Sequence, residues 1–80
     1  MQNNQSLAEN YLLTSLRLNH ELDQELNAAE TDYELGLLYK GNGKKSEALT
    51  HLMNALKYFN KNNSKTISLE IETQMMGLNN

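Results

Sequence analysis

The two histidines are the side chains best suited to chemistry, and each has carboxylates nearby in the sequence. His51 follows Glu47 by one helical turn, and His20 is followed by Glu21 and Asp23. A zinc site needs three or four converging ligands, and the segment around His20 lacks the HExxH spacing of a zinc peptidase. A Glu and a His one turn apart are typical of a solvent-exposed helix face, where the pair contributes roughly a few tenths of a kcal/mol. We therefore predict no metal site and no cofactor.

Catalytic and phosphate-binding patterns are also missing. No Ser, Asp and His have the arrangement of a nucleophile elbow with its triad, and the chain has no Cys to serve as nucleophile, zinc ligand or disulfide partner. The segment KGNGKK, residues 40–45, contains Gly and Lys without the GxxxxGK[ST] order of a phosphate-binding loop. We expect a protein that is not an enzyme, in which this segment is a hinge with solvated lysines.

Length and charge exclude further classes of function. Eighty residues are expected to form a single domain, 1–80. The net charge of −3 disfavours binding to nucleic acid or to an anionic membrane surface. The N-terminal segment lacks the basic and apolar regions of a signal peptide, and no apolar run approaches the roughly 20 residues of a membrane span. These features predict a cytoplasmic protein that binds neither nucleic acid nor membrane.

The elements that position these side chains are predicted to be helices throughout. There is no proline, and apolar residues recur at steps of three and four. The predicted helices cover 6–19, 21–40, 44–60 and 65–77. The glycines of residues 41–43 end the second helix because they can adopt positive φ, and Ser64 can cap the fourth.

Two of these assignments have alternatives. No glycine separates the first helix from the second, and capping-box matches at Asn27 and Thr31 would place the start of the second helix later. The segment SLEIE, residues 68–72, alternates as a strand does.

The chain also resembles itself at an offset of 41 residues. Gly36 then coincides with Gly77, and Leu26 with Ile67. A shared period of this size is typical of stacked helix pairs. It predicts one complete pair flanked by two half-repeats.

Residues 29–62 resemble a tetratricopeptide repeat, whose pattern is W-x2-L-G-x2-Y, then A-x3-F, then P. The matching residues, to which the resemblance assigns the packing of the helix pair, are Leu35, Gly36, Tyr39, Ala48, Leu52 and Ala55. Asp32 replaces the Trp, Asn60 replaces the Pro, and the offset exceeds the usual period of about 34 residues, as in longer variants in bacterial regulators. The resemblance implies an all-α fold of antiparallel helix pairs of α-solenoid type; a generic four-helix bundle is the alternative.

The resemblance also implies a function. Stacked helix pairs form a concave surface lined by the first helix of each pair. Here the residues of that groove would be Glu30, Tyr33, Leu37 and Lys40. We expect a protein–protein interaction module, regulatory or scaffolding, that binds a peptide or a partner helix there. The alternative is a self-assembling structural subunit or a fragment of a longer regulator with such repeats.

Each half-repeat is expected to expose the apolar side chains that a missing neighbour would cover. These candidates are Leu7, Leu12, Leu16, Ile67, Ile71 and Met75. Large exposed apolar patches mark interfaces, and two-fold closure is the commonest assembly, so we predict a homodimer. A head-to-tail filament, or a monomer whose fourth helix covers the first, would be the alternatives.

Overall fold

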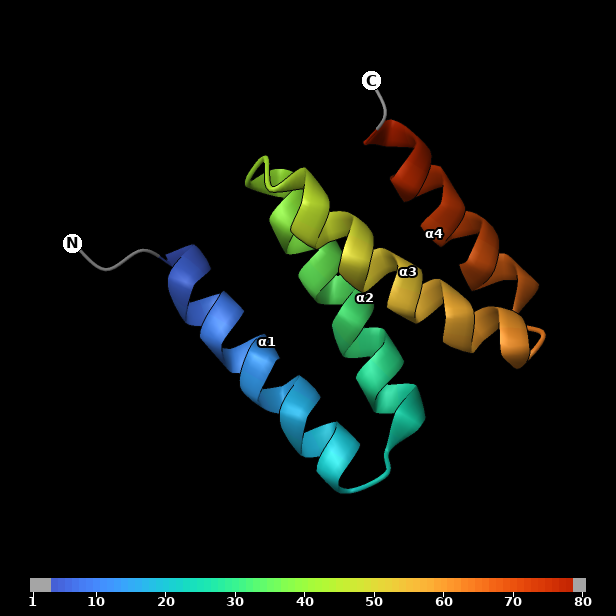
Figure 1. The fold of residues 1–80 in the computed structure, drawn as a ribbon, viewed down its shortest axis with the longest axis horizontal. Helices are drawn as coiled ribbons and strands as arrows, with labels where there is room; N and C mark the ends of the chain where they lie inside the picture. Colours follow the sequence, from blue (N-terminus) through green and yellow to red (C-terminus); the bar gives the residue numbers. More distant parts are fainter. Residues whose placement is uncertain (1–3, 79–80) are drawn as a thin grey trace.

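A computed structural model describes residues 4–78, and the regular structure in this range is entirely α-helical. The four helices are α1 (Asn4–Glu21), α2 (Glu25–Gly41), α3 (Lys45–Lys61) and α4 (Lys65–Gly77). Adjacent helices pack against each other, with α1 on one side of α2 and with α3 and α4 on the other (Figure 1). The predicted all-α class with four helices is confirmed, and residues 68–72 belong to a helix, not to a strand.

The predicted boundary between the first two helices is wrong by several residues. The first helix continues to Glu21, and the second begins at Glu25 rather than at residue 21. The break is made by Asp23, whose φ is 57°. Asp is one of the few residues other than Gly that adopt this left-handed conformation, so the turn forms without a glycine.

The three turns between helices share one geometry. The residues with positive φ are Asp23, Gly43 and Asn63. In each turn the next backbone amide donates to the carbonyl five residues earlier, as Gln24 N does to Asn19 O at 2.8 Å. This pattern is the Schellman motif.

The turns also set the period of the fold. Because they recur at 23, 43 and 63, helix pairs repeat every 40 residues, not every 41 as predicted. Gly36 therefore corresponds to Met76 rather than to Gly77.

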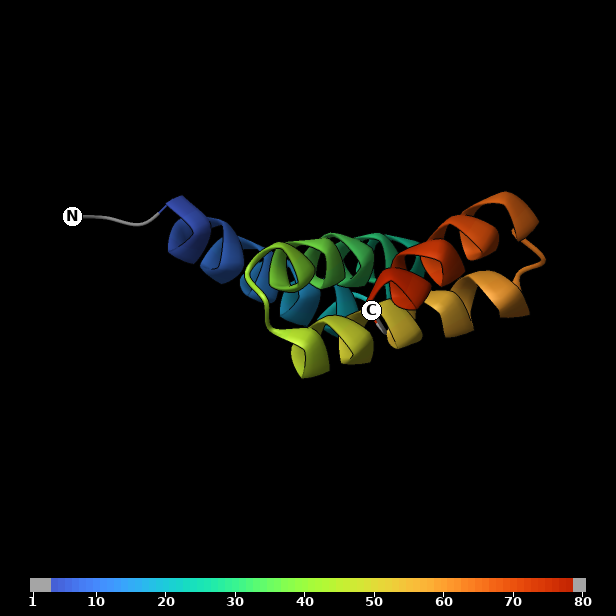
Figure 2. The same cartoon turned by 90° about the horizontal axis from the view of Figure 1, so that it is seen from above.

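The core lies mainly between α2 and α3, which form the most extensive helix pair. Its buried apolar side chains are Ala29, Leu35, Tyr39, Ala48, Leu52, Ala55, Phe59, Ile71 and Leu78. Gly36 lets the two helices approach closely, because a Cβ there would lie 2.6 Å from Cγ of Leu52. The six residues to which the resemblance assigns helix-pair packing are all buried here. In the view of Figure 2, α2 and α4 lie on the same side of α3.

Across residues 4–78, none of the helices combines the length and apolar character that crossing a membrane requires.

Candidate partner-binding groove

The four predicted groove residues lie on one face of α2. Glu30, Tyr33, Leu37 and Lys40 are separated by steps of three and four, which keeps them on the same side of a helix. Glu30 and Leu37 are exposed, whereas Tyr33 and Lys40 are half-buried. The structure thus divides the predicted groove into an open part and a part that the chain itself occupies.

The occupied part is covered by α4. The hydroxyl of Tyr33 donates to Oε2 of Glu70 at 2.6 Å. The ammonium of Lys40 donates to Oε1 of Gln74 at 2.7 Å and to its backbone carbonyl at 3.1 Å. Burial, followed by the hydrogen bond to Glu70 and by the charge of Glu70, raises the pKa of Tyr33 to about 12. Tyr33 and Lys40 therefore connect α2 to α4 through hydrogen bonds.

The open part continues toward α1. A cleft of about 360 Å³ lies between α1 and α2, and its lining residues are Tyr11, Leu12, Ser15, Asn19, Asn27, Glu30, Thr31 and Glu34. The Asn19 amide donates to the Thr31 hydroxyl at 3.4 Å and so connects the two walls. The lining includes two carboxylates, Glu30 and Glu34, and no Lys or Arg. The cleft is therefore acidic.

Two leucines lie on the same exposed part of α2. Leu26 is 49% exposed and Leu37 is 36% exposed, although both are large apolar side chains. We refer to Leu26, Glu30, Glu34 and Leu37 as the acidic strip. Sequence reasoning placed Glu30 and Leu37 in the groove and missed Leu26 and Glu34. The spacing of the four residues indicates in the sequence that they share one face of the helix, but only the structure shows that this face is exposed.

A second polar cluster lies on the opposite side of α2. Nδ1 of His51 on α3 lies 2.8 Å from Oδ1 of Asp32, whose side chain is only 7% exposed. The ring of His51 stacks on Tyr39 with 5.5 Å between centroids, and the Tyr39 hydroxyl donates to Oε2 of Glu9 at 2.6 Å. Burial is the main cause that raises the pKa of Tyr39 to about 12, followed by this hydrogen bond. The cluster connects α1, α2 and α3.

This cluster corrects the interpretation of His51. The sequence predicted a solvent-exposed pair with Glu47, but the ring is half-buried and its partner is Asp32, 19 residues earlier. Asp32 on α2 and His51 on α3 therefore form a polar contact between two helices. Within the described part of the chain, no group of three or more His, Cys, Asp or Glu side chains could hold a metal ion.

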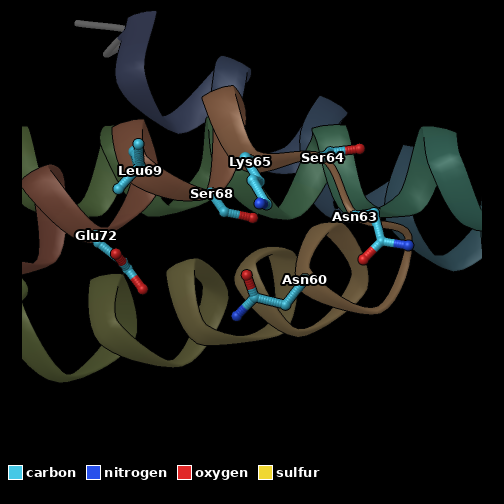
Figure 3. A pocket seen from close by; sticks show the side chains of 7 residues that line it. All are labelled: Asn60, Asn63, Ser64, Lys65, Ser68, Leu69 and Glu72. Atoms are coloured by element: carbon cyan, nitrogen blue, oxygen red, sulfur yellow. The ribbon is translucent and has the colours of Figure 1, made fainter.

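A third site lies between the end of α3 and the first half of α4. It is a cavity of about 350 Å³ lined by Asn60, Asn63, Ser64, Lys65, Ser68, Leu69 and Glu72. The buried Oγ of Ser68 has no hydrogen-bond partner, and Figure 3 shows this side chain between the two helices. Lys65 and Glu72 bring opposite charges to the same lining, so the cavity has no single charge preference.

The 40-residue period explains this cavity. Ser68, Leu69 and Glu72 correspond to Ala28, Ala29 and Asp32 on α2. On α2 these residues are buried, and they line a cleft whose other wall is α3. The cavity at Ser68 therefore lies on the face of α4 that corresponds to the α3-covered face of α2, and no helix of the described residues covers it.

The predicted dimer contacts need a correction. Of the six candidates, only Leu7 is largely exposed, at 52%. Ile71 is fully buried, and the other candidates pack against the core, namely Leu12, Leu16, Ile67 and Met75. The packing of α1 on α2 and of α4 on α3 covers them within the chain.

No protein-family model matches the chain, and neither a curated protein nor a solved structure is significantly similar to it. Four packed helices do not by themselves identify a tetratricopeptide repeat, so the resemblance of residues 29–62 stays a prediction.

Proposed function

We propose that this chain is a protein–protein interaction module whose acidic strip binds a basic, partly apolar peptide or helix. The observation that carries this proposal is the composition of the exposed face of α2. Two exposed leucines lie on the same face as two carboxylates, beside a cleft that contains no basic side chain.

The chemistry of the strip sets the chemistry of the partner. Glu30 and Glu34 are one turn apart, which suits Lys or Arg side chains one turn apart on a partner helix. Leu26 and Leu37 lie beyond the two carboxylates on either side and offer apolar contacts. An amphipathic helix recognised through residues spaced by three and four meets both requirements. The net charge of −3 favours the approach of a basic partner.

A peptide selection tests this proposal. The intact chain is immobilised and presented with a random peptide library, and the enriched peptides are sequenced. We expect enrichment of Lys and Arg together with large apolar residues, and binding that weakens as salt rises. Glu30→Lys with Glu34→Lys should abolish the enrichment of basic residues, and Leu26→Ser with Leu37→Ser should remove the apolar preference.

The matched control is Glu72→Lys, which reverses an exposed carboxylate on α4 outside the strip. It should leave the selected peptides unchanged. Unchanged enrichment in the Glu30→Lys, Glu34→Lys variant, or equal losses in the control, would refute the assignment of the strip.

A further inference from the structure

The outer face of α1 has an exposed apolar stripe. Leu7, Tyr11 and Leu18, together with Leu22 directly after the helix, are 52%, 72%, 42% and 64% exposed, respectively. Their spacing of four, seven and four residues places them on one side of α1. Leu12 and Leu16, which pack against the core, lie on a different side. Figure 1 shows α1 at the edge of the helix array, with no further helix beyond it.

Four large apolar side chains in one line differ from the isolated surface leucines that are common in proteins. Contiguous exposed apolar surface usually marks an interface. The stripe contains no charged residue, so a partner that binds through basic side chains has no counterpart on it. Its occupant must present an apolar face.

The spacing of the stripe, four, seven and four residues, is the same in both directions. In an antiparallel pair centred between Thr14 and Ser15, Leu7 of one helix lies opposite Leu22 of the other. Tyr11 likewise lies opposite Leu18. We propose that the stripe binds the stripe of a second copy of this chain, with the two α1 helices antiparallel about a two-fold axis at Thr14–Ser15.

The charges beside the stripe agree with this arrangement. Arg17 and Glu21 lie along one edge and already form an ion pair at 3.0 Å. In the antiparallel pair both face the segment around Asn10 of the second copy. Glu9 of that segment is turned toward Tyr39 of its own chain, which donates to it at 2.6 Å, so it does not oppose Glu21. The centre has the small side chains Thr14 and Ser15, which permit the close approach that helix pairing requires.

The other exposed helix face fits a second copy less well. In the 40-residue period α4 corresponds to α2, and α1 corresponds to α3. The face of α4 with Leu69 and Met76 is therefore the one that α3 covers on α2. In a head-to-tail contact, α1 of a second copy would have to pack on this face as α3 packs on α2. On α2 the contact depends on Gly36, where even a Cβ would lie 2.6 Å from Leu52. Met76 occupies that position on α4, so a head-to-tail contact of the same geometry is blocked.

The mass of the chain in solution gives the first test. Sedimentation equilibrium at tens of micromolar should give twice the chain mass of 9.1 kDa. Leu18→Glu should give the monomer mass while retaining its helical circular dichroism. Met53→Glu, at a 55% exposed apolar residue of α3, should remain dimeric. A wild-type chain that stays at 9.1 kDa at several hundred micromolar would overturn the proposal.

Single cysteines test the geometry, because the natural chain has none. In the antiparallel pair the two copies of Thr14 are offset by only about 1.5 Å along the axis, and the two copies of Leu7 by about 22 Å. Thr14→Cys should therefore oxidise to a covalent dimer, and Leu7→Cys should do so only when mixed with Leu22→Cys. Thr50→Cys, at an exposed position of α3, is the control that measures crosslinking by random collision.

Each remaining outcome counts against the arrangement. Self-crosslinking of Leu7→Cys would indicate parallel helices. Crosslinking of Tyr11→Cys with Glu72→Cys would indicate head-to-tail stacking. A dimer in which Thr14→Cys crosslinks no better than Thr50→Cys must use another surface. None of these variants changes the acidic strip, so failure here leaves the proposed function standing.

Discussion

The carboxylate of Asp32 lies 2.8 Å from Nδ1 of His51 and joins α2 to α3 at a site that is largely closed to solvent. Removing either partner leaves a polar group with little access to water, which costs about 1–3 kcal/mol. We expect Asp32→Ala and His51→Ala each to lower the free energy of unfolding in urea by that amount. The double variant should lose less than the sum of the two, because the interaction can be lost only once.

Glu47→Ala is the control for this pair. Glu47 is exposed and one turn from His51, and its loss should change the free energy of unfolding by less than about 0.5 kcal/mol. An equal effect of all three substitutions would show that the hydrogen bond between the helices contributes nothing specific.

Gly36 and Gly41 should respond oppositely to the same substitution. Gly36→Ala places a Cβ 2.6 Å from Cγ of fully buried Leu52, and such overpacking typically costs about 1–3 kcal/mol. Gly41→Ala, on the same helix, meets nothing within 4 Å and should raise stability by up to about 1 kcal/mol through helix propensity. Thermal unfolding of both variants measures the difference. A stabilised Gly36→Ala chain would contradict the close contact of α2 and α3.

Ser68→Ala should stabilise the chain. The buried Oγ of Ser68 has no hydrogen-bond partner, and an unsatisfied buried group costs about 1–3 kcal/mol. Ala also has the higher helix propensity. Urea denaturation should show a gain in the free energy of unfolding on the order of 1 kcal/mol. The comparison is Ser64→Ala, at a position with no side-chain capping bond. A loss of stability in Ser68→Ala would mean that the hydroxyl finds a partner in solution.

Alkaline pH should weaken the fold through Tyr33 and Tyr39. Both pKa values are raised from 10.0 to about 12, first by burial and then by hydrogen bonds to Glu70 and Glu9. The neutral hydroxyls stabilise the folded state fully below pH 10, and this contribution is lost as the pH rises through about 12. Urea midpoints measured across this interval should fall less steeply in Tyr33→Phe with Tyr39→Phe than in the wild type. An equally steep fall of the urea midpoint in both proteins would contradict the role of the two tyrosines in this loss of stability.

The local elements follow from sequence because their signals are local. Steps of three and four between apolar residues predicted four helices, and Gly43 marked the middle turn. Asp23 and Asn63 adopt the same backbone conformation as Gly43 without being glycine, so the first turn was misplaced. The match of Gly36 with Gly77 likewise suggested a period of 41, whereas the period of 40 follows from backbone geometry.

The tertiary structure decided which neighbour covers each face. Periodicity shows that Ile71 lies on an apolar side of its helix, but only the packing of α4 shows that the chain itself buries this residue. In the same way, Tyr33 is aromatic and well placed for a groove, yet it donates to Glu70, 37 residues away. His51 has a carboxylate one turn away but pairs with Asp32 on another helix. The spacing of residues determines which side chains share a face, whereas the position of the neighbouring helix determines which of them remain free for a partner.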